Sequence, residues 1–81
     1  MGSKNAVFSM TSFIGKRVKV EIRLYGRYLE GTLKSFDRYS NVALENIVEY
    51  NRSDDGKYEK DAEYSEALVR GDSIVNISLK E

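Results

Sequence analysis

Two short polar stretches carry side chains that together could hold a nucleobase. In the first, which runs from Ser35 to Asn41, Tyr39 stands two residues before Asn41. The tyrosine ring offers a flat stacking face, and the carboxamide offers both a hydrogen-bond donor and an acceptor. The second stretch, residues 69–72, reads Val-Arg-Gly-Asp near the end of the chain. If the two stretches form turns that meet in space, they complete one binding site.

Each of these residues also has an ordinary structural interpretation. Tyr39 alone is typical of a partly buried aromatic on a turn, and Asn41 is typical of a backbone cap. Arg70 fits a charge at a strand end, and Asp72 fits a turn. We assign Asp37 to structure, because a carboxylate at the start of a turn accepts backbone N–H bonds. The base-binding interpretation therefore depends on the joint pattern.

Alternating apolar and polar residues predict β-strands around both turns. The alternation is cleanest from Arg17 to Leu24, and Tyr25-Gly26 then predicts a tight reversal. Gly31 interrupts the interior of the next strand, which indicates a sharp bend or a close backbone approach. The predicted strands are residues 17–24, 27–36, 42–50, 64–70 and 73–79.

The remaining segments predict one helix and one long loop. Residues 6–14 predict a short helix that ends at Gly15, and residues 51–63 predict a long, variable, solvated hairpin loop with frayed strand at its ends. Short connections favour antiparallel pairing, so the fold class is mainly β: a small, open, five-stranded, bent barrel of OB or SH3 type. An apolar edge strand is either an aggregation hazard or an assembly surface.

Composition narrows the classes of function. The 81 residues predict a single domain, 1–81, in which residues 1–5 are disordered or a tag remnant. The chain has no Cys and no His, so we expect no disulfide, no metal site and no cofactor. No apolar run approaches the roughly 18 residues of a membrane helix. We expect a cytoplasmic protein without a membrane partner.

The net charge is zero, which alone argues against a general nucleic-acid binder. The charge is nevertheless divided. Residues 1–38 hold eight Lys/Arg and three acidic residues, whereas residues 39–81 hold five and ten. Such a division is typical of a surface dipole or of complementary faces in an oligomer, and equally of a solvated mixed surface.

Two motifs resemble those of the Sm/Sm-like (LSm) family, in its archaeal type. The first runs from Val18 to Leu44 and includes Glu-Gly-Thr-Leu at 30–33 and Asp-x-Tyr-x-Asn at 37–41. The second is Val-Arg-Gly-Asp-Ser-Ile-Val at 69–75. With the helix, the resemblance covers about residues 8–79. It departs from the family pattern at Tyr39, where many members have His, and at Ser40, which is often Met.

The resemblance implies a ring, commonly of seven subunits, in which the fourth strand of one subunit pairs with the fifth of the next. It implies uridine-rich single-stranded RNA at the inner rim, and a role as RNA chaperone or ribonucleoprotein scaffold in RNA processing or decay. By that resemblance Tyr39 and Arg70 would stack on the base and Asn41 would read its edge. Asp72 would orient either the amide or the arginine, and Gly71 would allow a tight turn.

Other functions remain open at this stage. The chain could be one subunit of a hetero-oligomeric eukaryotic LSm ring, or an SH3-like module that binds peptides. The SH3-like alternative requires an exposed aromatic groove, and the tyrosines form no cluster in sequence. An enzyme is not expected, because the chain lacks His, Cys, a phosphate-binding glycine loop and clearly spaced paired acids.

Overall fold

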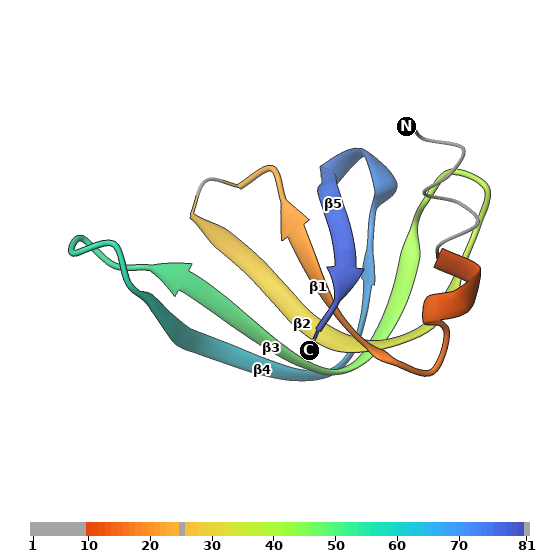
Figure 1. The fold of residues 1–81 in the computed structure, drawn as a ribbon, viewed down its shortest axis with the longest axis horizontal. Coiled ribbons are helices and arrows are strands. Elements are labelled where there is room, and N and C mark those ends of the chain that lie inside the picture. Colours follow the sequence, from red (N-terminus) through yellow and green to blue (C-terminus); the bar gives the residue numbers. More distant parts are fainter. Residues whose placement is uncertain (1–9, 25, 81) are drawn as a thin grey trace.

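The computed structural model describes residues 10–24 and 26–80. Within them, five antiparallel strands form one sheet in the order β4-β3-β2-β1-β5 (Figure 1), which confirms the predicted fold class. The strands are β1 (Arg17–Ile22), β2 (Arg27–Phe36), β3 (Val42–Arg52), β4 (Tyr58–Val69) and β5 (Ile74–Leu79), with a 3-10 turn, η1 (Gly71–Ser73), before the last strand. Strands β4 and β5 are the two edges of this sheet.

The N-terminal helix is described from residue 10 to residue 13. Residues 6–9 of the predicted helix lie outside the described residues. Gly15 follows with a φ of +84°, and its N–H donates to the Leu33 carbonyl at 2.8 Å. The Leu33 N–H in turn donates to the Lys16 carbonyl at 3.0 Å, so the helix end is joined to β2. Among the described residues, no helix has the length and apolarity that crossing a membrane requires.

The sheet bends where β2 pairs with β3, and Gly31 makes the bend possible. A Cβ at Gly31 would lie 3.2 Å from both the Glu45 carbonyl oxygen and Ile47 Cγ1. The β2–β3 register shifts between Glu30 and Thr32, on either side of this glycine. The predicted close backbone approach is therefore confirmed.

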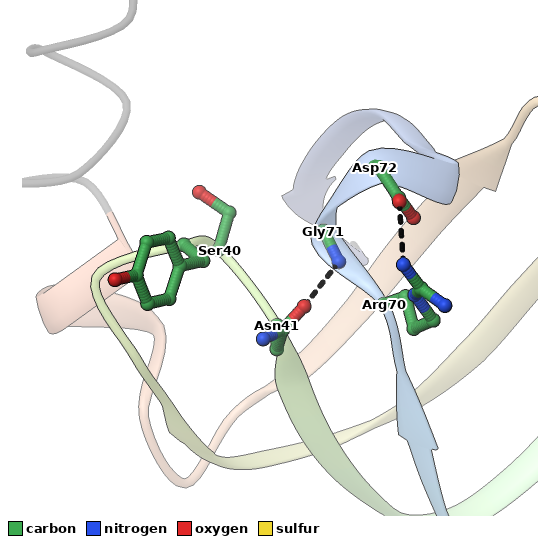
Figure 2. Close-up of a pocket in the computed structure, with 6 residues that line it drawn as sticks. Ser40, Asn41, Arg70, Gly71 and Asp72 are labelled. Carbon is green, nitrogen blue, oxygen red and sulfur yellow. Dashed lines mark hydrogen bonds and ion pairs between the residues drawn. The ribbon is translucent and has the colours of Figure 1, made fainter.

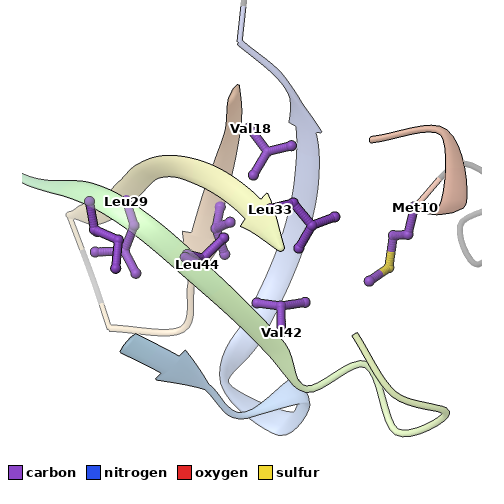
Figure 3. Packing of buried hydrophobic residues seen from close by; sticks show 8 residues of the cluster. Met10, Val18, Leu29, Leu33, Val42 and Leu44 are labelled. Atoms are coloured by element: carbon purple, nitrogen blue, oxygen red, sulfur yellow. The ribbon is translucent and has the colours of Figure 1, made fainter. Parts of the chain in front are cut away.

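The core lies inside the bend (Figure 3). Each fully buried apolar side chain stabilises the fold by about 1.5–3 kcal/mol relative to an exposed one. Met10 packs onto this cluster from the helix, so the helix closes one end of the core. The side chains with less than 2% exposure are Val18, Val20, Leu33, Val42, Leu44 and Ile47.

The prediction of a long loop at residues 51–63 is wrong in extent. Strand β3 continues to Arg52 and β4 begins at Tyr58, so the hairpin projects beyond the rest of the sheet (Figure 1). The backbone ladder continues through the pairs Asn51↔Glu59 and Arg52↔Tyr58. The distal ends of β3 and β4 have no buried core beneath them. Backbone pairing and contacts between side chains stabilise them instead.

Three tyrosines supply part of that support. Tyr28 and Tyr50 stack with ring centroids 4.9 Å apart, and Tyr58 meets Tyr28 edge-on at the same separation. Aromatic pairs of this kind each contribute about 0.5–1.5 kcal/mol beyond the area they bury. These three tyrosines are scattered in sequence but clustered in space. Their spacing along the chain is therefore no argument against an exposed aromatic surface.

Candidate nucleic-acid interface

The two predicted turns meet and line one open hollow of about 660 Å³. Figure 2 shows the 39–41 turn on one side and the 70–72 segment on the other. The predicted residues all line this hollow, together with Ser40: they are Tyr39, Asn41, Arg70, Gly71 and Asp72.

The backbones of the two turns touch at Gly71. Its N–H donates to Asn41 Oδ1 at 2.6 Å (Figure 2). A Cβ on Gly71 would lie 2.0 Å from the Tyr39 carbonyl oxygen and 2.9 Å from the carbonyl carbon of Ser40. Ser40 has a φ of +65°, which turns the chain toward Gly71. The glycine is thus required by contact between two backbones.

Asp37 organises the first turn from within. Its Oδ1 accepts the backbone N–H groups of Tyr39 at 2.8 Å and Asn41 at 3.1 Å, as expected from its position. Its Oδ2 also accepts a bond from Asn41 Nδ2 at 2.9 Å, which the sequence interpretation missed. The side-chain bond from Asn41, followed by the backbone N–H bonds, lowers the pKa of the Asp37 carboxyl group below its ordinary value.

These contacts fix the polarity of the Asn41 amide. Oδ1 faces the Gly71 N–H, and one Nδ2 hydrogen goes to Asp37. A carboxamide has two N–H hydrogens and two acceptor lone pairs. One hydrogen and one lone pair therefore remain for a ligand, a donor and an acceptor side by side.

Arg70 and Asp72 form the opposite wall. Arg70 Nη2 donates to Asp72 Oδ2 at 2.8 Å (Figure 2), so Asp72 orients the arginine and not the amide. The sequence analysis allowed Asp72 to orient either the amide or the arginine. The carboxylate that orients the Asn41 amide is that of Asp37. Arg23, which was not predicted, donates from Nε to the Asp72 carbonyl at 2.8 Å. The only signal in the sequence for Arg23 was its position near the end of the alternating segment 17–24.

Tyr39 is 69% exposed, with its ring available to a ligand. The Arg38 guanidinium lies 5.3 Å from the ring centroid, within cation–π range. The site thus combines an aromatic ring, a planar guanidinium and an oriented amide, which suit a flat heteroaromatic ring with polar edges. Within residues 10–24 and 26–80, no three His, Cys, Asp or Glu side chains lie close enough to hold a metal ion.

With the fold and the geometry of the hollow described, the chain can be compared with known families. The LSM domain model matches residues 9–79, and the chain therefore belongs to the LSM domain family. The family resemblance read from the two sequence motifs is confirmed.

Three archaeal structures illustrate the similarity. An Sm-like protein from Archaeoglobus fulgidus is 29% identical with a TM-score of 0.76, covering 99% of this chain and 97% of that one. A heptameric archaeal Sm protein is 30% identical with a TM-score of 0.70, covering 91% and 98%. The Pyrococcus abyssii Sm protein, in complex with a uridine heptamer, is 26% identical with a TM-score of 0.73, covering 91% and 96%.

Proposed function

We propose that this protein assembles with copies of itself into a ring and binds uridine-rich single-stranded RNA in the hollow between its two turns. It would act as an RNA chaperone or ribonucleoprotein scaffold in RNA processing or decay. The observation that carries the proposal is the convergence of Tyr39, Asn41 and Arg70 on one open hollow, with the Asn41 amide held in one orientation.

The role of each side chain follows from its chemistry. Tyr39 and Arg70 provide the two planar groups between which a base can stack. The free hydrogen of Asn41 Nδ2 donates to a uracil carbonyl, and its Oδ1 accepts from the uracil N3–H. Base stacking contributes about 1–3 kcal/mol per base, so one subunit binds weakly and repetition around a ring is needed for useful affinity.

The sheet supports assembly through its edges. Strand β4 is one edge and β5 is the other, so a head-to-tail contact between copies would join two different edges. Leu68 on β4 is 80% exposed, an apolar side chain that such a contact would cover. The similarity to a heptameric archaeal Sm protein supports a homoheptamer. A ring of mixed paralogues is the alternative, and it predicts that the purified chain alone stays small.

The experiment that tests the proposal is light scattering of the purified chain with and without a uridine heptamer. We expect a ring-sized mass and saturable binding. Arg70→Ala should keep the mass and lose at least about tenfold in affinity, because it removes one stacking wall. Lys57→Ala, which removes one positive charge from the remote β3–β4 turn, is the matched control and should bind normally. A ring that ignores oligouridine would contradict the proposed site.

Binding should be insensitive to pH across about 5 to 8, because the chain contains no His. The pKa of Asp37 is lowered in the folded protein by its bond from Asn41. The contribution of the Asp37 carboxylate to stability is therefore fully present above its pKa in the unfolded chain. That contribution is lost as the pH falls through its lower pKa in the folded protein. Fluorescence anisotropy with labelled oligouridine should show a plateau that declines only in acid. A midpoint near neutrality would contradict this account.

A further inference from the structure

The tyrosine cluster forms part of a second hollow, of about 320 Å³. Tyr28 has Tyr50 stacked on it, Tyr58 against it at an angle, and the Lys19 ammonium 4.4 Å from its ring centroid. Burial, followed by the charge of Glu30, raises the pKa of the Tyr28 hydroxyl. Tyr28 is partly buried, whereas Tyr58 is 47% exposed and presents its ring to the surface.

Basic side chains outnumber acidic ones in the lining of this hollow. It includes Lys19, Arg23 and Arg27 against one acidic residue, Glu21. Arg27 pairs with Glu49 and Lys19 lies 3.9 Å from Glu21, so part of this charge is balanced. Arg23 makes its contact to a backbone carbonyl, and its positive charge is therefore not neutralised by that bond.

Arg23 connects the second hollow to the first. Its guanidinium lines the tyrosine hollow and donates to the carbonyl of Asp72, which lines the base site. A chain of nucleotides leaving Arg70 and Asp72 would therefore meet a basic side chain first and an exposed aromatic ring next. A positively charged path with aromatic stacking faces is the usual design of single-strand binding surfaces.

We propose that the tyrosine hollow is a second contact surface for the same single-stranded RNA, in which Tyr58 stacks on a base and Arg23 contacts the adjoining phosphate. This inference rests on the proposed function of the base site. Tyr28 holds Tyr58 in place and does not itself take a base, because Tyr50 stacks on its ring and the Lys19 ammonium lies over it. The surface recognises nucleotides beyond those in the base sites, without strong sequence preference.

Nucleic acid is favoured over a peptide by the basic excess and by the continuity with the base site. The exposed apolar side chains Leu24 and Val75 also line the hollow and would suit a peptide anchor. A peptide-binding surface would leave RNA affinity unchanged when Tyr58 is replaced, so the test separates the two.

The test compares three oligonucleotides on the assembled protein. The first is a uridine heptamer, the second is a longer oligouridine, and the third is the heptamer extended by abasic ribose phosphates to the same length. The abasic extension carries the same charge without bases. The wild type should bind the longer oligouridine about fivefold or more tightly than the abasic extension, because only the former can stack on Tyr58.

Tyr58→Ala should remove that difference and leave heptamer affinity unchanged, whereas Tyr58→Phe should retain it. Melting temperature and solution mass show whether Tyr58→Ala keeps the hairpin and the assembly. If it does not, Lys19→Gln, on β1 at the same hollow, is the second variant and should weaken binding of both extended oligonucleotides. Equal affinity of the wild type for the two extensions, or a difference that survives Tyr58→Ala, would overturn the inference. A wild type that fails to bind the heptamer would overturn the proposed base site itself.

Discussion

Gly71→Ala is expected to abolish detectable oligouridine binding. The new Cβ would lie 2.0 Å from the Tyr39 carbonyl oxygen, so the two turns must separate. Separation breaks the bond from the Gly71 N–H to Asn41 Oδ1 and releases the amide. Overpacking of this kind costs about 1–3 kcal/mol of stability. Isothermal calorimetry measures the loss of oligouridine binding, and thermal melting measures the loss of stability.

Gly56→Ala is the matched control for this substitution. Gly56 lies in the β3–β4 turn with a φ of +87°, and apart from its two chain neighbours no heavy atom of the described residues lies within 4 Å of the position that its Cβ would take. Alanine there is strained by about 1–2 kcal/mol without any clash. The control should therefore lose comparable stability and keep oligouridine binding. Equal loss of binding in both variants would mean that stability, and not the contact between turns, limits RNA binding.

The sequence predicted the bent sheet well because its signals are local. Strand β2 was predicted with its observed bounds, since alternation and flanking turn residues determine a strand without reference to its partners. Gly31 was correctly interpreted because a glycine inside a strand usually marks a bend or a close approach of another backbone. The five residues predicted to form the site do line one hollow, although their roles on a ligand stay predictions.

What the sequence did not predict depends on pairing across long separations. The polar segment from Glu59 to Glu63 has no apolar periodicity, so only its register with β3 makes it a strand. The contact of Tyr28 with Tyr58 joins residues that are far apart in the chain and follows from that same register. The link from Arg23 to Asp72 likewise exists only after β1 and β5 pair.

The exchange of Asp37 and Asn41 should separate the structure of the turn from its recognition of a base. In Asn41→Asp alone, Oδ1 still accepts from Gly71, but a second carboxylate faces Asp37 where the 2.9 Å hydrogen bond was. In Asp37→Asn alone, two NH₂ groups face each other, and rotating the Asn41 amide would turn a donor toward the Gly71 N–H. Both single variants should have a lower melting temperature than the wild type.

The double variant Asp37→Asn/Asn41→Asp should restore the turn. The amide oxygen at position 37 can accept the backbone N–H groups of residues 39 and 41, as the Asp37 carboxylate does now. Its NH₂ can donate to the new carboxylate at position 41, which still accepts from Gly71. Melting temperature should therefore return toward that of the wild type, because every bond in the network again joins a donor to an acceptor.

RNA binding should not return with it. Position 41 would present only acceptors to the base, and the uracil O4 and O2 atoms are acceptors too. We expect at least about a tenfold loss for oligouridine, since a hydrogen bond to the base edge is replaced by repulsion between acceptors. A carboxylate accepts from the cytosine N4 amino group, so oligocytidine should become the preferred ligand of the double variant. Competition between labelled oligouridine and oligocytidine measures this directly. A double variant that regains both stability and uridine preference would show that the amide of Asn41 holds the turn together and does not read the base.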